Sequence, residues 1–244
     1  SRPAYLLSPV FGFAAALLAA FLVWERVLWP HSASLGDLIV VVYLLTVPAT
    51  AVIIGGFASA NPLASLGASR EMKLLLSYEL PFLLALLVPV IRAGSINPGE
   101  IVLFQSVHGP FLGSLSGLIA FAVVLICQQA KLTFAPFDLP DAETEISGGA
   151  FMEYAGPPLA LFRLTRMMLL FTLPVLLVAL FWGGIGLSAP GILAGAGKIA
   201  LILFLAIVIK NTNPRVRIDQ AMRFFWGPLA ALAAGAVILA LLGM

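Results

Sequence analysis

Cysteine and charged residues are both scarce in this chain, and each shortage narrows what the protein can do. Cys127 is the single cysteine, so the chain can form no internal disulfide and cannot supply the roughly four thiolates that hold an iron–sulfur cluster. The two histidines, His31 and His108, lie far apart and lack the spacing of metal ligands. No basic run with interleaved aromatic residues supports nucleic-acid binding. We therefore expect no catalytic, cofactor-binding or metal-binding residue here, and any redox metal must belong to a partner.

Charged residues make up 10% of the sequence, whereas soluble globular proteins carry about 25%. The chain is 61% hydrophobic, with a mean hydropathy of +1.10. Crossing a bilayer as a helix takes about 20 apolar residues. Seven segments come near or exceed that length, at residues 5–28, 36–57, 74–92, 113–133, 159–182, 191–210 and 222–243. The sequence thus predicts an all-α integral membrane protein, with about seven transmembrane helices in one polytopic domain over residues 1–244.

The basic residues predict how these spans are oriented, because cytoplasmic loops carry an excess of Lys and Arg. Counted over alternate loops, one side receives ten of the 13 and the other receives three, namely Arg26, Arg92 and Lys198. The ten are Arg2, Arg70, Lys73, Lys131, Arg163, Arg166, Lys210, Arg215, Arg217 and Arg223. We expect the ten-charge side to face the cytoplasm of a cell inner membrane. The chain starts with Ser1 rather than Met, and we expect it to begin inside a longer protein.

Acidic residues are few as well, yet four of the 11 lie in one segment, APFDLPDAETEIS at residues 135–147. They are Asp138, Asp141, Glu143 and Glu145. The surrounding loop, residues 131–158, is the longest and falls on the cytoplasmic side. Its aromatic residues are too apolar for a solvated tail, and its prolines and paired glycines indicate bends. We expect this loop to fold against the bundle or a docked protein, although a simple solvated loop is the competing interpretation.

Glu79 is the other unusual acid, because it lies inside the third predicted span, in KLLLSYELPFLLALLVPV. A carboxylate there is expensive, and ionisable residues within a membrane are candidates for function. Glu79 is thus a candidate proton relay, unless it lies near a helix end and reaches the interface. Arg70 precedes the same span and is either a counter-charge for the loop acids or an ordinary cytoplasmic charge.

Two long stretches resemble one known family. PFDLPDAETEISGGAFMEYAGPPLALF resembles the signature loop of the membrane subunit at the peripheral-arm junction of respiratory complex I, which is shared with energy-converting membrane-bound nickel–iron hydrogenases. GDLIVVVYLLTVPATAVIIGGFASANPLASLGASREMKLLLSYE is similar to the same family, and NPRVRIDQAMRFFW more weakly so. Within it, GASRE resembles the hydrogenase branch. The family has eight helices, and the seven spans here resemble the second to eighth; the first, with its Gly-Arg-Gly-Pro motif, is not visible.

The resemblance implies a non-catalytic subunit that anchors a hydrophilic redox arm and couples its chemistry to proton or sodium movement. Nickel–iron and iron–sulfur centres would then lie in hydrogenase-like large and small subunits on the cytoplasmic face, with antiporter-like neighbours in the membrane. The coupling acids carried over by motif are Glu79, Asp138, Asp141, Glu143, Glu145 and Glu153, with Arg70 and Arg217 as counter-charges. Tyr154 closes the loop motif together with Glu153.

Three other interpretations stay open. The chain could be the quinone-site membrane subunit of an NADH–quinone oxidoreductase, which would require a quinone tunnel. It could be a stand-alone ion transporter, a class that inverted repeats would support, although no convincing repeat is visible. It could also be a purely structural anchor, in which case the loop acids could be neutralised without loss of coupling.

Overall fold

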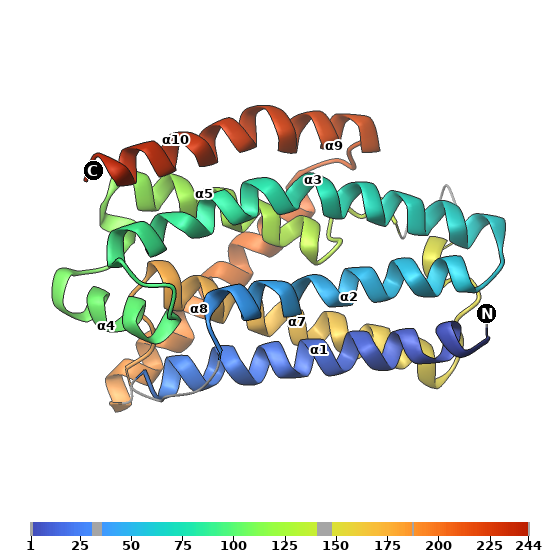
Figure 1. Ribbon diagram of the computed structural model, residues 1–244, viewed down its shortest axis with the longest axis horizontal. Coiled ribbons are helices and arrows are strands. Elements are labelled where there is room, and N and C mark those ends of the chain that lie inside the picture. Colours follow the sequence, from blue (N-terminus) through green and yellow to red (C-terminus); the bar gives the residue numbers. More distant parts are fainter. Residues whose placement is uncertain (1, 31–35, 141–147, 187, 244) are drawn as a thin grey trace.

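The computed structural model describes residues 2–30, 36–140, 148–186 and 188–243, and they form a bundle of long helices (Figure 1). The long helices are α1 (Arg2–Leu28), α2 (Leu38–Ala58), α3 (Pro62–Ala93), α5 (Leu115–Lys131), α7 (Pro157–Phe181) and α8 (Ala189–Thr212). A last continuous helix is built from α9 (Ile218–Phe224), a π-helical turn (Phe225–Leu229) and α10 (Ala230–Leu241). Within the described residues, six helices have the length and composition to cross a membrane, and α5 is a shorter apolar one. The predicted all-α membrane bundle is confirmed.

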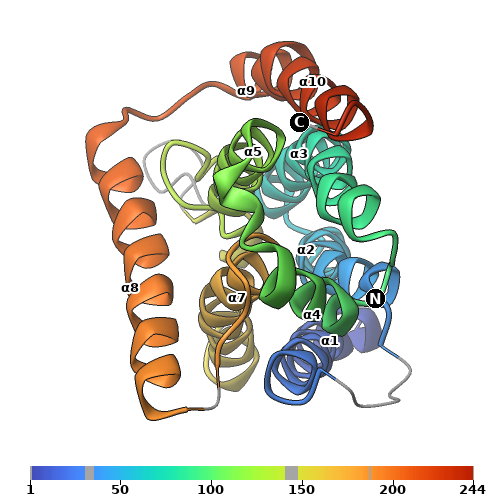
Figure 2. The same cartoon turned by 90° about the vertical axis from the view of Figure 1, so that its left-hand side faces the viewer.

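The helices pack in two groups that meet at α3. Helix α1 lies against α2 and α7, while α3 lies against α2, α5 and α10 (Figures 1 and 2). Small residues allow the close approach of α1 and α2: a Cβ built on Gly12 would come within 3.0 Å of the Ala51 Cβ. Such small contacts are typical of membrane helices, whose backbones approach closely. Helix α3 therefore has neighbours from both halves of the chain.

Helix α3 is longer than the sequence predicts. The stretch ANPLASLGASRE has the composition of a turn between two spans, but the helix already begins at Pro62 and runs for 32 residues. Asn61 caps it by accepting a hydrogen bond from the Leu63 amide, and Pro62 stands at the first helical position, where its missing N–H costs nothing. At about 1.5 Å per residue the helix is about 48 Å long. It therefore extends well past the hydrocarbon layer, which is about 30 Å thick.

A shorter helix that the sequence did not predict, α4 (Pro98–His108), lies between α3 and α5, together with a 3-10 turn (Phe111–Gly113). Gln105 of α4 is buried and joins it to the end of α7. Its Nε2 donates to the Ala179 carbonyl at 2.9 Å, and its Oε1 accepts from the Gly183 amide at 2.9 Å. The carbonyls left open at a helix end need such partners. The C-terminal end of α7 is therefore closed by a side chain from α4.

Helix α8 stands apart from the rest of the bundle, as the view in Figure 2 shows. Its buried residues are Gly195, Ile202 and Ala206, and the remainder of its surface is at least partly exposed. The residues between α8 and α9 run beside the loop that follows α5: the Val216 amide donates to the Pro136 carbonyl at 3.1 Å. A short segment thus connects an outlying helix to the acidic loop.

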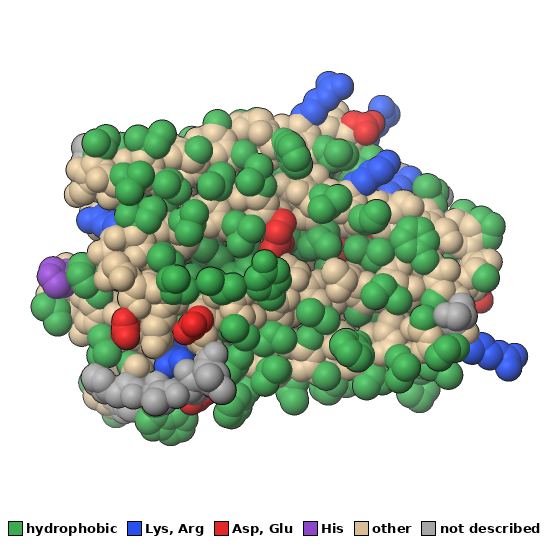
Figure 3. Space-filling view, in the orientation of Figure 1, with side chains coloured by type: hydrophobic (Ala, Val, Ile, Leu, Met, Phe, Trp, Pro, Cys, Tyr) green, Lys and Arg blue, Asp and Glu red, His purple; other side chains and the backbone are tan. Residues whose placement is uncertain are grey.

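The outside of the bundle is strongly apolar. Figure 3 shows hydrophobic side chains over most of one face, with basic side chains towards its ends. Phe11 is 71% exposed and Phe204 61% exposed, which would be unfavourable in water over so large an area. A lipid environment removes that penalty, so the surface agrees with a multi-pass membrane protein.

Candidate functional site

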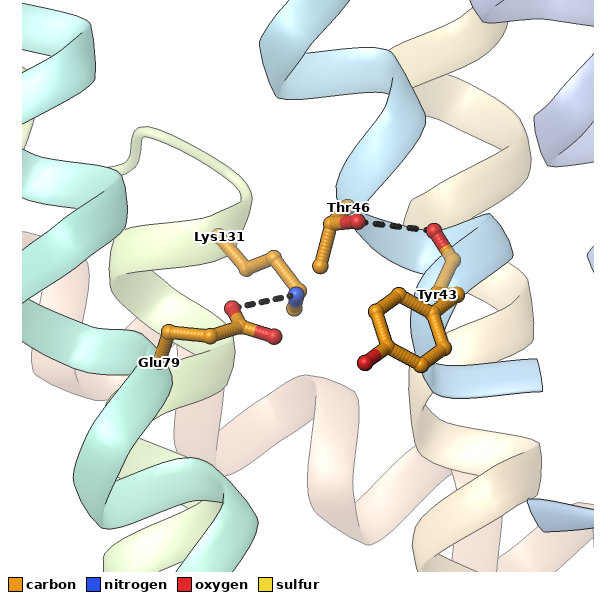
Figure 4. Close-up of polar contacts among 4 residues, drawn as sticks. All are labelled: Tyr43, Thr46, Glu79 and Lys131. Carbon is orange, nitrogen blue, oxygen red and sulfur yellow. Dashed lines mark hydrogen bonds and ion pairs between the residues drawn. The ribbon is translucent and has the colours of Figure 1, made fainter. Parts of the chain in front are cut away.

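Glu79 lies near the middle of α3, and its carboxylate pairs with a lysine from α5. The Lys131 Nζ is 3.4 Å from Glu79 Oε2 (Figure 4). The lysine side chain is 1% exposed and the glutamate side chain 21% exposed. Two aromatic rings of α3 flank the ammonium, with the Tyr78 centroid at 5.1 Å and the Phe82 centroid at 4.8 Å. A charged pair and two cation–π contacts thus form a polar centre within the bundle.

Lys131 reaches this position because α5 ends inside the protein. Its C-terminal residues Gln128, Gln129 and Lys131 are all buried. The loop then turns back into the bundle, where Phe137 is 4% and Leu139 3% exposed. The sequence assigned Lys131 to the cytoplasmic loop charges, and in the structure it is a buried partner of Glu79. A signal was present: three polar residues in the run QQAK end an apolar helix, and two of them, Gln128 and Lys131, have the spacing of one helical face.

A groove of about 570 Å³ lies between α2 and α3, and Glu79 forms part of its wall. Most of its lining is aliphatic. Its polar groups, apart from Glu79, come from α2, at Tyr43, Thr46 and Thr50. Figure 4 shows Tyr43 and Thr46 across from Glu79, with the Thr46 Oγ1 donating to the Tyr43 carbonyl at 2.7 Å. The groove thus gives the Glu79 carboxylate an opening to the outside of the chain.

A second, much smaller cavity of about 40 Å³ includes Lys131 in its wall. Its polar lining residues are Glu71, Lys131, Thr133, Thr165 and Arg166. Glu71, which is 3% exposed, lies eight residues before Glu79 on the same helix. A cavity of this kind is large enough for water and polar enough to hold it. Lys131 belongs to the wall of this cavity and not to that of the groove.

Of the four acids in the loop, Asp138 is the one within the described residues. Its Oδ1 lies 3.2 Å from Arg215 Nε, and its backbone carbonyl accepts from Arg215 Nη2 at 2.8 Å. Asp141, Glu143 and Glu145 lie outside the described residues. Asp138 is therefore held by the segment between α8 and α9, while Glu79 is held by α5.

The end of the loop is fastened to α1 by aromatic residues. Tyr154 stacks on Tyr5 with ring centroids 4.2 Å apart, and its hydroxyl donates to the Tyr5 carbonyl at 3.0 Å. Burial raises the pKa of the Tyr154 hydroxyl, which keeps it protonated as a donor. Glu153 is exposed, and its carboxylate accepts a hydrogen bond from the Asn61 side chain. Tyr154 thus ties the loop to the start of α1, and Glu153 ties it to the start of α3.

The two predicted counter-charges lie on different elements. Arg70 is half-buried in the N-terminal part of α3, one residue before Glu71. Arg217 stands at the start of α9, where its backbone amide donates to the Gln220 side chain at 3.2 Å. The arginine that pairs with Asp138 is Arg215, two residues earlier. The sequence did not distinguish these neighbours, since both follow the same turn.

Metal-ligating side chains do not gather in the part of the chain that the structure describes. No group of three or more His, Cys, Asp or Glu residues there is arranged to hold an ion. Cys127 is a buried free thiol on α5, four residues before Lys131. The polar groups at the centre of the bundle include carboxylates, an ammonium and hydroxyls, which are groups able to exchange protons.

The fold and this centre define a polytopic α-helical membrane protein with an ion pair between two of its helices. The family model described as NADH dehydrogenase matches residues 1–241, and the chain belongs to that family. Among similar proteins is an NADH-quinone oxidoreductase subunit of Geobacillus kaustophilus (strain HTA426). It is 35% identical over 248 residues, covering 98% of this chain and 72% of that protein. The corresponding protein of Bacillus thuringiensis (strain Al Hakam) is 34% identical over 249 residues, again covering 98% and 72%.

A solved structure is similar as well. It is that of the membrane-bound sulfane sulfur reductase, an archaeal respiratory membrane complex, with a TM-score of 0.89 and 29% identity. The match covers 97% of this chain and 79% of the other. The predicted family, the membrane subunit shared by complex I and its relatives, is confirmed by these comparisons.

Proposed function

We propose that this chain anchors the hydrophilic redox arm of a complex I-related assembly and couples electron transfer to proton or sodium movement. The observation that carries the proposal is the Glu79–Lys131 pair, a carboxylate and an ammonium 3.4 Å apart inside a lipid-exposed bundle. Charges at such depth are retained where they line an ion path. The similar proteins are a quinone oxidoreductase subunit and part of a respiratory membrane complex, which supports a role in energy coupling.

The acidic loop is the proposed receiver of the redox signal. Asp138, Asp141, Glu143 and Glu145 lie within eight positions, so this loop concentrates carboxylates in an otherwise apolar chain. A change of charge in an arm docked above the loop would act on this concentration of carboxylates. Arg215, which pairs with Asp138, would sense the same change. Glu79 then carries the response into the membrane.

The proposed partners follow from the same assignment. Large and small redox subunits with nickel–iron and iron–sulfur centres would dock on the cytoplasmic face, on the side predicted from the basic residues, and antiporter-like subunits would adjoin the bundle. The stretch GASRE favours the hydrogenase branch. A quinone-reducing arm is the second candidate, and the names of the curated relatives favour it.

The first test separates these branches. The native complex is purified in mild detergent, its subunits are identified by mass spectrometry, and its metals are measured. Nickel together with a hydrogenase large subunit supports the hydrogenase branch. A similar subunit without nickel, together with flavin or quinone, supports the quinone branch. A chain that purifies alone contradicts the coupling proposal.

The second test addresses coupling. Complexes carrying Glu79→Gln are reconstituted in liposomes, and ion uptake is measured per electron transferred. We expect the ratio to fall by at least about ten-fold, because the amide cannot carry the proton. Glu100→Gln is the matched control, since Glu100 is an exposed acid in the first turn of α4. Full ion uptake by the Glu79 variant would contradict the relay role.

A further inference from the structure

We propose that Lys131 itself carries protons, between the small cavity lined by Glu71 and the groove lined by Glu79. This inference rests on the proposed coupling function and makes Lys131, besides Glu79, a member of the proton path. In this assignment the ammonium is a transfer group. The competing assignment, in which the ammonium only balances the charge of Glu79, predicts a different result for Lys131→Arg.

The placement of Lys131 between two compartments is the first support. The groove on the α2–α3 side includes Glu79 in its wall, and the small cavity includes Glu71. Lys131 lines the cavity and is at the same time 3.4 Å from Glu79. It therefore belongs to one compartment and forms an ion pair with the acid of the other. A proton that passes from one compartment to the other by this route meets the ammonium.

The separation of the two acids is the second support. Glu71 and Glu79 are eight residues apart on one helix, which corresponds to about 12 Å along its axis. Direct proton transfer needs two groups in hydrogen-bond contact, as Lys131 Nζ and Glu79 Oε2 are, or one bridging water. An intermediate group is therefore needed, and Lys131 pairs with Glu79 and lines the same cavity as Glu71. Arg166 also lines the cavity, but a guanidinium stays protonated in proteins and cannot serve.

Unpartnered polar groups near Lys131 are the third support. Within the described part of the chain, the Tyr78 hydroxyl and both amide atoms of Gln128 are buried without a hydrogen-bond partner. Tyr78 flanks the ammonium, and Gln128 lies one helical turn before it on α5. Buried polar atoms are normally satisfied, and ordered water is the usual partner where protein atoms are lacking. The centre around Lys131 is thus suited to internal water, as is the cavity that Lys131 shares with Glu71.

The transfer step balances without any further reactant. The Lys131 ammonium donates one proton to the Glu79 carboxylate, which leaves a neutral amine and a carboxylic acid. The amine then takes a proton from the Glu71 carboxylic acid through one water in the cavity. One proton has moved from Glu71 to Glu79, and Lys131 is again an ammonium. Lysine suits this role because a buried ammonium changes its protonation state readily, whereas arginine does not.

The decisive variant is Lys131→Arg, which keeps a positive charge beside Glu79 but cannot release its proton. It is compared with Lys131→Met and Glu71→Gln in the reconstituted complex, with ion uptake measured per electron. The matched control is Lys198→Arg, because Lys198 is also partly buried but donates to the Trp182 and Gly184 carbonyls. Subunit composition is checked by mass spectrometry for each variant. This control shows whether a lysine-to-arginine change in itself disturbs the complex.

We expect Lys131→Arg and Glu71→Gln to assemble and to lose at least about ten-fold in ion uptake per electron, and the Lys198 control to keep it. Full uptake with Lys131→Arg would overturn the inference, since it would make Lys131 a counter-charge. If Lys131 variants fail to assemble, Glu71→Gln decides: normal uptake overturns the inference and lost uptake supports it. If Glu79→Gln uncouples and Lys131→Arg does not, this inference alone fails. If the wild type moves no ions, the proposed function fails with it.

Discussion

Two lysines that are withdrawn from solvent in this protein have opposite surroundings. The Lys131 ammonium lies beside a carboxylate and two aromatic rings, and it adjoins a cavity with a second acid. The partly buried Lys198 ammonium lies 2.8 Å from the Trp182 carbonyl and 3.2 Å from the Gly184 carbonyl, which follow the end of α7. Carbonyls at a helix end need donors whatever the protein does.

The difference shows how a structural charge can be separated from one suited to chemistry. Around Lys198 each hydrogen-bond partner is a backbone atom that cannot change its protonation state. Beside Lys131, the Glu79 carboxylate can gain a proton, and Glu71 in the wall of the neighbouring cavity can donate one. The same side chain thus caps a helix end in one place and has the proposed transfer role in the other. Four substitutions test this difference.

Reversing the charge at position 131 should have the largest effect. Lys131→Glu places two carboxylates together inside the bundle. We expect the free energy of unfolding to fall by about 3–5 kcal/mol, which is the cost of breaking a buried ion pair. The measurement is thermal unfolding of the detergent-solubilised complex. Combining it with Glu79→Lys restores an ion pair and should recover at least half of the loss. No recovery would mean that the pair does not hold α3 and α5 together.

Gln105→Leu should cause the second-largest loss of stability. It removes the donor to the Ala179 and Leu180 carbonyls and the acceptor for the Gly183 amide, next to the carbonyls that Lys198 binds. Leaving such buried groups unpaired costs about 1–3 kcal/mol. Thermal unfolding again gives the value, while ion uptake per electron should not change. Lost coupling at full stability would show that this end also takes part in transfer.

Lys198→Met should cost less, about 1–2 kcal/mol, because Trp182, whose carbonyl it leaves unpaired, is only partly buried. We expect a lower unfolding temperature and an unchanged ratio of ions to electrons. This ratio is compared with that of Lys131→Met, because both variants replace an ammonium with the same apolar side chain. An equal loss of ion uptake per electron in Lys198→Met and Lys131→Met would contradict the different roles of the two lysines.

Arg215→Gln should have the smallest effect. Its partner Asp138 is 39% exposed, so the pair is screened by water and contributes less than about 1 kcal/mol. The loss should shrink further at high salt, whereas that of Lys131→Glu should not. Unfolding at two ionic strengths measures both. A large, salt-independent loss would place Asp138 in the same class as Glu79.

Much of the fold follows from composition alone. Apolar runs of bilayer length predict helices because the backbone must satisfy its own hydrogen bonds in lipid. The first turns of α3 were not predicted because Asn61, Pro62 and Gly67 have the composition of a turn. The same Asn-Pro pair also fits a helix cap and first position, and the structure realises that alternative. Helix α4 was missed because its eleven residues are too few to form a span.

The candidate site was predicted in part, and the reason lies in distance along the chain. Glu79 is conspicuous by itself, as a carboxylate inside an apolar segment. Lys131 is 52 residues away, and its burial depends on where α5 stops and on how the loop re-enters the bundle. Arg215 reaches Asp138 across 77 residues for similar reasons. Local patterns reveal which charges are unusual, but only tertiary packing reveals which of them meet.

The distance between Glu79 and Lys131 also has a consequence for the making of the protein. A ribosome delivers α3 to the membrane before α5 exists, so the Glu79 carboxylate precedes its partner by 52 residues of synthesis. An unpaired carboxylate is costly in lipid. During that interval the side chain must be protonated, solvated or shielded by the insertion machinery. The Glu79 carboxylate of α3 can therefore form its ion pair only after α5 has been inserted, and that pair joins the two helices.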